Sequence, residues 1–400
     1  MRYKVGMARH ATASGGPAAL DSAPNVVARA AGLAPRLRSE LCWIRRVQAG
    51  SRSDLHRELN LRKNTIGVDV ARMIELGLLR ESAGAAATSG RPGVLLEIDP
   101  ERRNVLGVSI DPEHITARRF NLLGQPLGEP LQKQVAQPAR LVSAAASAIR
   151  SLCDKQTLAV GVAAPGYIEP ATHRVLFSAA WPDGRRVSLD ALCKAAHPAP
   201  VVVDNQVNAL ASRWLLEHAA QPQEDHLLIF ISDGRVGATL TVAGRPVRGA
   251  LIGCNELGHM RLPVKTARCY CGETGCLERI FSSPQLKRFA GGADLHAALT
   301  AAKPSKALRQ ITELIALGFS NIINFARAGH VTLMSDMPDA TRYFEQLIEA
   351  LRPKVLRELE RRTRFQIWIE PRPARSSSAA AVALGDLFLP TNFPVNTNAE

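Results

Sequence analysis

Long hydrophobic runs are missing from the sequence, and so is any segment typical of a secreted protein. No apolar run approaches the roughly 18 to 20 residues that a membrane helix needs. Residues 1–40 are rich in Ala, Gly, Ser and Pro but lack the continuous apolar core of about 7 to 15 residues that marks a signal peptide. We therefore expect no membrane partner, a cytoplasmic location, and a flexible arm over residues 1–40.

Acidic residues are in deficit. The chain carries 36 Asp and Glu against 50 Lys and Arg, which gives a formal net charge of +14. Such an excess favours a polyanionic partner such as nucleic acid, although basic surfaces without such partners are also common. At 400 residues the chain is too long for one ordinary core and indicates two or three domains.

Cysteines are few, and their number is odd. Three of the seven are crowded into eight residues, at positions 269, 271 and 276. This crowding favours a metal site over disulfides. The other four lie in apolar contexts and are interpreted as buried free thiols: Cys42, Cys153, Cys193 and Cys254.

The first hundred residues do contain a helical pattern. Apolar residues recur at helical spacing in two segments joined by a tight Asn60–Leu61 turn; they are Leu55 and Leu59, then Ile66, Val70, Met73 and Ile74. Two short helices around such a turn predict a helix-turn-helix. In "SGRPGVLLEI", Gly90 and Pro92 mark a turn before a strand, which predicts the wing of a winged helix. Residues 41–100 are therefore predicted to be a DNA-binding domain.

The second helix of this unit would present polar residues on the face away from its core. These are Arg62, Lys63, Asn64, Thr65 and Arg72, with Asp69 as a further candidate. Side chains of this kind meet phosphates and base edges in a major groove. Arg91 stands at the tip of the predicted wing, where it is placed to enter a minor groove. The alternative is a small helical subdomain whose basic residues are merely solvated.

The crowded cysteines belong to a metal-ligand pattern within residues 255–283. Three thiolates and an imidazole from ten residues upstream close a tetrahedron, which leaves no open position and predicts a structural zinc ion. Gly272 and Gly275 let the backbone turn tightly enough for the ligands to converge. The alternative is a set of buried free thiols. The predicted ligands are His259, Cys269, Cys271 and Cys276.

Taken together, the motifs resemble the ROK family of repressors, open reading frames and sugar kinases. They are the "GRP" of the predicted wing, "GVAAPGYIEP" (161–170), "VVVDNQVNALA" (201–211), "RGALIGCNELGHM" (248–260) and "CYCGETGCLE" (269–278). The resemblance implies a multidomain chain, in which an N-terminal winged helix-turn-helix is followed by a two-lobed α/β actin-like ATPase (ROK) domain. This second domain would span 101–390, with a sugar cleft between its lobes and the zinc loop at 255–283, and a tail would occupy 391–400.

The same resemblance argues against catalysis. Family kinases carry an acidic base directly after the Asn of the strand-end motif, but this chain has Gln206, whose amide has no useful basicity. The turn matching the first phosphate loop, Ser109–Glu113, holds a proline without a donor and two carboxylates that repel phosphate. The second loop, "FISDGRVGATL", keeps few glycines, and "VTLMSDMPDA" replaces a late glycine pair. We expect no catalytic residue, and a chain that is not an enzyme.

The sugar side of the implied cleft is better kept. By resemblance, Asn205, Glu256, His259 and Glu278 match positions that hydrogen-bond sugar hydroxyls, and Gln206 can still donate and accept a hydrogen bond. A family Asn is absent where "VLFSAAW" has Ala179 and Ala180. The alternative for Glu256 and Glu278 is that they only orient the zinc loop.

These patterns lead to one hypothesis and two rivals. We expect a sugar-responsive transcriptional regulator, a repressor, whose partners are operator DNA and a sugar or sugar-phosphate effector. We expect it to form a homodimer or homotetramer, since a dimer would place two winged helices on a two-fold operator. One rival is a DNA-binding regulator whose cleft no longer binds sugar. The other is a divergent ATP-dependent sugar kinase.

Overall fold

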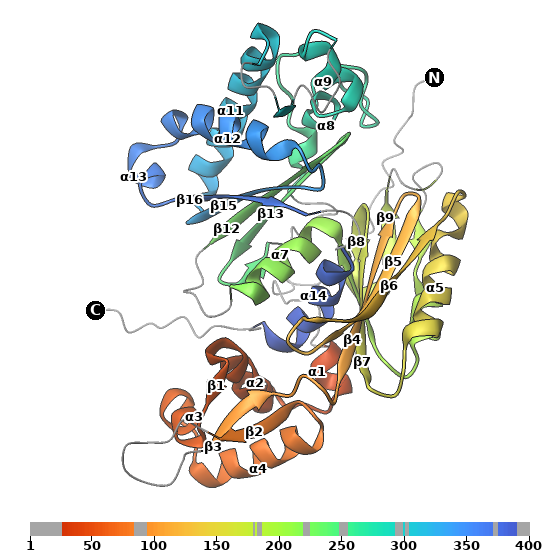
Figure 1. Cartoon of the computed structure of the whole chain (residues 1–400), viewed down its shortest axis with the longest axis vertical. Coiled ribbons are helices and arrows are strands. Elements are labelled where there is room, and N and C mark those ends of the chain that lie inside the picture. The colour runs from red at the N-terminus through yellow and green to blue at the C-terminus, as the bar shows by residue number, and fades with distance from the viewer. Residues whose placement is uncertain are drawn as a thin grey trace, which may run out of the picture.

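A computed structural model of the chain describes residues 26–83, 94–178, 181, 186–218, 225–247, 255–292, 299–300, 304–370 and 375–389. It has an N-terminal unit and a larger body of two α/β lobes (Figure 1). Among the described residues, no helix is both long enough and apolar enough to cross a membrane.

The N-terminal unit combines helices with a small antiparallel sheet. Its helices are α1 (Val26–Ala30), α2 (Pro35–Val47), α3 (Arg52–Leu59) and α4 (Lys63–Glu75). Its strands are β1 (Ala49–Gly50), β2 (Leu79–Ala83) and β3 (Val94–Ile98), in the order β1-β3-β2. A capping box formed by Ser51 and Asp54 begins α3, and Asn60 ends it in the left-handed conformation with φ 52°. The predicted pair of helices around this turn is therefore present.

The predicted boundary of the arm is wrong, because residues 26–40 are not an arm. They form α1 and the first half of α2, and they bury Val27, Leu33 and Leu37. These side chains pack against helix α14 (Arg375–Phe388) at the other end of the chain. The Ala-rich composition concealed this docking, since its apolar partner surface lies more than 300 residues away in sequence.

Lobe 1 is built on a five-stranded sheet of order β11-β7-β4-β5-β6. Its strands are β4 (Asn104–Asp111), β5 (His114–Asn121), β6 (Pro126–Gln134), β7 (Thr157–Ala164) and β11 (Val201–Asn205). The helical turn η1 (Pro138–Arg140), α5 (Leu141–Leu152) and α6 (Asp190–Ala196) follow on one face. A smaller sheet holds β8 (Tyr167–Glu169), β9 (Arg174–Phe177) and β10 (Val187–Ser188), with η2 (Pro170–Thr172) between the first two.

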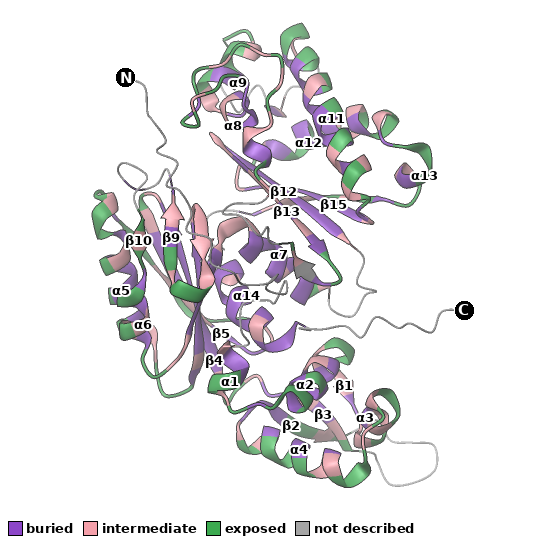
Figure 2. Ribbon diagram, turned by 180° about the vertical axis from the view of Figure 1, so that it is seen from behind, coloured by how far each residue is buried: buried purple, intermediate pink, exposed green. Residues whose placement is uncertain are grey.

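Helix α14 covers the other face of the lobe 1 sheet at very short range. A Cβ atom added at Gly107 would lie 2.0 Å from the Ser376 carbonyl oxygen, and one at Gly161 would lie 2.0 Å from that of Ala379. Glycine is therefore required at both strand positions to let the helix backbone approach. Helix α7 (Gln206–Glu217) packs beside α14 (Figure 1), and in Figure 2 both helices are largely buried.

Lobe 2 has a second five-stranded sheet, of order β14-β13-β12-β15-β16. Its strands are β12 (His226–Ser232), β13 (Arg235–Val242), β14 (Arg245–Pro246), β15 (His330–Ser335) and β16 (Arg364–Ile369). Its helices are η4 (Leu257–His259), α8 (Leu277–Ile280), α9 (Ser283–Phe289), α11 (Lys306–Ala326), α12 (Ala340–Leu351), η5 (Arg352–Lys354) and α13 (Arg357–Glu360). The chain leaves lobe 1 through β11 and α7 and returns through α14, which agrees with the predicted two-lobed architecture.

Candidate effector cleft, metal centre and nucleic-acid face

The strand-end motif lies at the junction of β11 and α7. The Asn205 side chain caps the helix by accepting a hydrogen bond from the Asn208 N–H at 2.8 Å. Gln206 is the first residue of α7, and its amide donates to the Ile110 carbonyl at 2.9 Å and to the Asp111 carboxylate at 3.1 Å. The residue at the expected base position therefore fastens α7 to the end of β4.

A cavity of about 370 Å³ opens beside this junction, between the lobes. Of the five residues predicted to bind sugar, four line it: Asn205, Gln206, Glu256 and Glu278. His259 lies behind the wall, where its Nε2 is 2.8 Å from the Tyr270 hydroxyl and 3.8 Å from a Glu256 carboxylate oxygen. The structure thus brings four of the five predicted residues to the cavity lining, whereas His259 lies beside Tyr270 and Glu256.

Sequence reasoning missed an aromatic wall and two cations in this cavity. Phe177 lies between Tyr167 and Tyr270, with ring centroids 5.6 and 5.9 Å away. Arg235 and Arg279 also line the cavity. The only local signal was the tyrosine inside "CYCG", since the other four residues sit in motifs that were interpreted for different roles.

The two cleft glutamates differ from ordinary surface carboxylates. Burial, together with the nearby Glu256 carboxylate, raises the pKa of Glu278 to about 7. Burial also raises the pKa of Glu256, although a hydrogen bond from Tyr167 opposes this change. Carboxyl groups and amides at such a site can hydrogen-bond the hydroxyl groups of a polar ligand, while the aromatic rings can cover its apolar face.

The four predicted metal ligands converge beside the cleft. The ligand atoms of His259, Cys269, Cys271 and Cys276 all lie within 4.8 Å of one another. The Sγ atoms of Cys271 and Cys276 are 3.6 Å apart, and the Cys269 Sγ is 3.7 Å from the His259 Nδ1. Tetrahedral zinc with Zn–S bonds of about 2.3 Å places two sulfurs roughly 3.8 Å apart. The donor set therefore fits a closed zinc site.

The glycines of this loop serve the predicted purpose. Gly272 has φ 95° and Gly275 has φ 80°, and residues other than glycine rarely adopt this backbone conformation. A Cβ at Gly275 would also lie 2.4 Å from the Leu262 carbonyl oxygen. The loop can therefore bring the four ligands together only if residue 275 is glycine.

The candidate nucleic-acid face is the outer side of α4. Arg62, Lys63 and Asn64 are exposed at its amino end, and Thr65 is half-buried. Arg72 is exposed one turn before the helix end and pairs with Glu75 at 2.6 Å. Arg91 lies outside the described residues.

One prediction for α4 is wrong. Asp69 does not face outward: it is 3 % exposed and pairs with Arg36 of α2 at 2.6 Å. A helical projection places Asp69 beside the core positions Ile66, Val70 and Met73. Its burial follows because Arg36 supplies a partner for the carboxylate.

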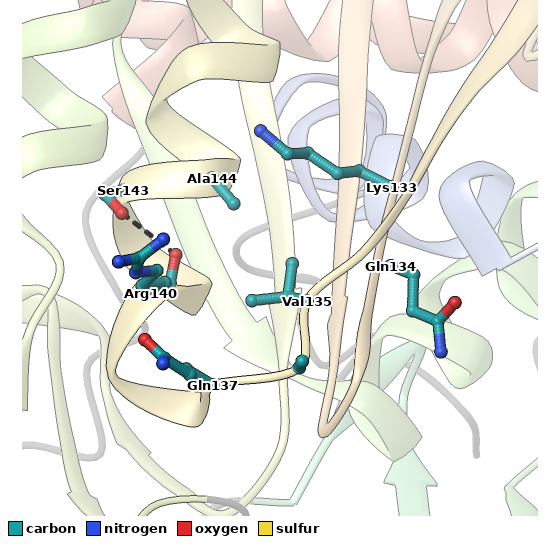
Figure 3. Close-up of a pocket in the computed structure, with 8 residues that line it drawn as sticks. Lys133, Gln134, Val135, Gln137, Arg140, Ser143 and Ala144 are labelled. Carbon is teal, nitrogen blue, oxygen red and sulfur yellow. Dashed lines mark hydrogen bonds between the residues drawn. The ribbon is translucent and has the colours of Figure 1, made fainter.

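A hollow of about 550 Å³ lies on lobe 1, and Figure 3 shows residues that line it. It is larger than the cleft and shares no lining residue with it. It opens between the end of β6 and the start of α5, and its lining includes Lys133, Gln137 and Arg140. The Ser143 hydroxyl donates to the Arg140 carbonyl at 3.0 Å. The hollow contains none of the residues predicted to bind sugar or metal, so its size does not make it the candidate site.

Comparison with curated proteins finds transcriptional regulators among the relatives of this chain. The chain is 25% identical over 250 residues to the xylose repressor of Caldicellulosiruptor bescii, covering 59% of this chain and 61% of the relative. It is 27% identical over 226 residues to the DNA-binding transcriptional dual regulator NagC of Escherichia coli K12, covering 54% of each chain. The chain thus spans about three fifths or less of these relatives' length.

Solved structures agree on the fold. A ROK family transcriptional regulator, a homologue of the E. coli MLC protein, has a TM-score of 0.72 at 21% identity and covers 89% of this chain and 98% of its own. A ROK family glucokinase from Streptomyces griseus, in complex with glucose and AMPPNP, has a TM-score of 0.56 at 21% identity and covers 70% of this chain and 98% of its own. The ROK family model itself matches residues 121–389, about two thirds of the sequence, and this chain therefore belongs to the ROK family.

Proposed function

We propose that the protein is a sugar-responsive, DNA-binding transcriptional regulator that acts as a repressor. The observation that carries this proposal is the N-terminal unit, because the kinase and regulator structures differ in how much of this chain they cover. The glucokinase fold covers 70% of the chain, whereas the regulator fold covers 89%. The names of the xylose repressor and NagC point the same way.

The N-terminal unit has the parts of a winged helix-turn-helix. Helices α3 and α4 meet at the left-handed Asn60, and α4 buries Ile66, Val70 and Met73 while it exposes Lys63 and Asn64. The antiparallel strands β2 and β3 follow, and Arg91 lies between them in the sequence. We propose that α4 enters the major groove and that Arg91 reaches a minor groove from the wing.

The cleft is proposed as the effector site for a sugar or sugar phosphate. Its amide and carboxyl groups suit hydroxyl recognition, and its aromatic wall suits the apolar face of a sugar ring. Phosphoryl transfer is not proposed, because Gln206 cannot accept the proton and its amide is already bound to Ile110 and Asp111.

Zinc is proposed as the occupant of the Cys and His cluster. When bound, it would supply a rigid tetrahedral link and no reactive position. This link would fix the loop that carries Glu256 on one side and Glu278 on the other, so that metal binding and effector binding depend on the same segment.

The experiment is fluorescence anisotropy of the full chain with DNA from upstream of its own gene and with a scrambled duplex. We expect tighter binding to the upstream DNA, loss of binding when Lys63 and Arg91 are both replaced by Ala, and a change in affinity with one sugar of a panel. Equal affinity for the two duplexes would rule out sequence-specific DNA binding by the N-terminal unit. Specific DNA binding that no sugar or sugar phosphate alters, with no heat of sugar binding in calorimetry, would favour a regulator whose cleft has lost its ligand.

A further inference from the structure

Four charged side chains alternate in sign around one point between the lobes. We call them the interlobe ring: Asp111, Arg235, Asp336 and Arg375. The Arg375 guanidinium group pairs with the carboxylates of both Asp111 and Asp336. Arg235 approaches the same two carboxylates, each at 3.5 Å. The two positive and two negative charges give the ring a net charge of zero.

The ring spans the boundary between the lobes. Asp111 ends β4 in lobe 1, whereas Arg235 begins β13 and Asp336 follows β15 in lobe 2. Arg375 begins α14, the helix that returns to lobe 1. Opening the lobes would separate Asp111 from Arg235 or tear Arg375 from one of its two partners.

The ring also lies where the implied phosphate-loop segments meet. Asp111, Arg235 and Asp336 come from the three segments that the resemblance relates to nucleotide binding. The Gln206 amide joins them through Asp111, and the cavity left beside Arg375 and Ser109 measures about 10 Å³. That volume holds about one water molecule.

Three of the four members of the ring are buried. The exposed fractions of the Asp111, Asp336 and Arg375 side chains are 6, 3 and 6 %. Salt screens such pairs weakly, and loss of one partner leaves an uncompensated charge in the interior. Arg235 is 28 % exposed and lines the cleft, so a ligand there can touch the ring directly.

Helix α14 connects the ring to the N-terminal unit. Its 14 residues extend for about 20 Å from Arg375 to Phe388. At the far end, Asp386 accepts a hydrogen bond from the Val27 N–H at 2.7 Å, and its carbonyl accepts one from Arg38 at 2.9 Å. The Arg45 guanidinium group lies 5.6 Å from the centre of the Phe388 ring. One rigid helix therefore touches both the ring and α1 and α2.

We propose that the interlobe ring is a clasp that takes the place of a nucleotide. It holds the lobes together without ATP, and its integrity sets the position of α14 and thereby of the N-terminal unit. The first half of this inference rests on the ring alone, whereas the second half rests on the proposed DNA-binding function.

The test compares Arg375→Gln with Arg352→Gln in the full chain. Arg352 is the control for loss of an arginine outside the ring. It pairs with a carboxylate, Glu360 at 2.7 Å, and lies over an aromatic ring, Phe365 at 4.7 Å, wholly within lobe 2, with a side chain that is 45 % exposed. Hydrogen exchange is measured for the amides of the β4–β5 turn and of α14, operator affinity by anisotropy, and Mg-ATP binding by calorimetry.

We expect Arg375→Gln to speed exchange at both places by roughly tenfold and to change operator affinity by about fivefold or more, with Arg352→Gln unchanged. The wild-type chain should not bind Mg-ATP with a dissociation constant below about 1 mM. If Arg375→Gln does not fold, Arg235→Gln is the milder variant, because Arg235 is more exposed and its pairs are longer.

Tight Mg-ATP binding to the wild type, or equal exchange in the Arg375 and Arg352 variants, would overturn the clasp. Faster exchange with unchanged operator affinity would overturn its link to the N-terminal unit. If the wild type binds no specific DNA, the proposed function fails on its own, while exchange and calorimetry still decide whether the clasp exists.

Discussion

Glu40 gives the sharpest test of the N-terminal unit. It lies on α2 with an exposed fraction of 0 %, and neither carboxyl oxygen has a hydrogen-bond partner among the described residues. Burial first, and then the neighbouring Asp69 carboxylate, raise the pKa of Glu40 to about 8. The hydrogen bond from Arg36 lowers the pKa of Asp69, which keeps that neighbour charged. The perturbation is Glu40→Gln, which keeps the shape of a protonated Glu40.

The sign follows from the raised pKa. The folded state holds a proton on Glu40 that the unfolded chain releases above its ordinary pKa of 4.5. The stability that protonated Glu40 contributes to the folded state is therefore fully present below pH 4.5, and it is lost as the pH rises through about 8. The rise would correspond to about 5 kcal/mol if all of it acted on stability, and to about half of that if solvent around this small unit screens the charge. The amide of the Glu40→Gln variant does not titrate, so this dependence on pH disappears.

The assay is thermal unfolding of the wild type and of Glu40→Gln at pH 5, 6, 7 and 8. The variant should gain on the wild type as the pH rises, by about 2 kcal/mol between pH 5 and 8, or roughly 10 °C if the unit unfolds by itself. Glu58→Gln is the control, because Glu58 on α3 has a side chain that is 48 % exposed. A melting difference between Glu40→Gln and the wild type that stays constant over this range would refute the reasoning.

Three further predictions concern metal, catalysis and DNA. The purified chain should hold about one zinc ion, and Cys271→Ser should release it and lower the melting temperature, because a closed thiolate site contributes directly to folding; elemental analysis showing no metal in the wild type would contradict this. Gln206→Asp should not produce sugar-dependent ADP release, since Asp111 and Pro112 still occupy the first phosphate turn; turnover of about 1 to 100 per second in a coupled assay would be the opposite result. Lys63→Ala should reduce the slope of log affinity against log salt by about one, and an unchanged slope in anisotropy would mean that Lys63 touches no phosphate.

Local patterns in the sequence predicted the parts that local forces determine. Helices α3 and α4 follow from apolar spacing and from the Asn60 turn, and the metal cluster follows from ligands within 18 residues of one another. Both depend on contacts between near neighbours in sequence. The two-lobed fold and the cleft residues came instead from a resemblance of motifs. The family match agrees with the fold, whereas the roles of the cleft residues stay predictions.

Contacts between distant segments were beyond the sequence. Asp111 meets Arg375 across 264 positions, and Val27 meets Asp386 across 359. No periodicity in a single chain encodes such pairs. The error at Asp69 has the same origin, because a charged residue on a helix is expected to face solvent unless a partner from another helix is known.

The long-range contacts share one physical feature, which is that buried or partly buried charged and polar groups join separate elements. Arg36 and Asp69 fasten α4 to α2, the interlobe ring fastens the lobes, and Asp386 fastens α14 to α1. Buried ion pairs add little net stability compared with apolar packing, but a displaced partner leaves an unpaired charge at a cost of several kcal/mol. Apolar surfaces alone would let α1 and α2 slide along α14 at small cost. The polar contacts oppose such sliding, which the proposed regulator needs if an event in its cleft is to move α3 and α4 in one direction.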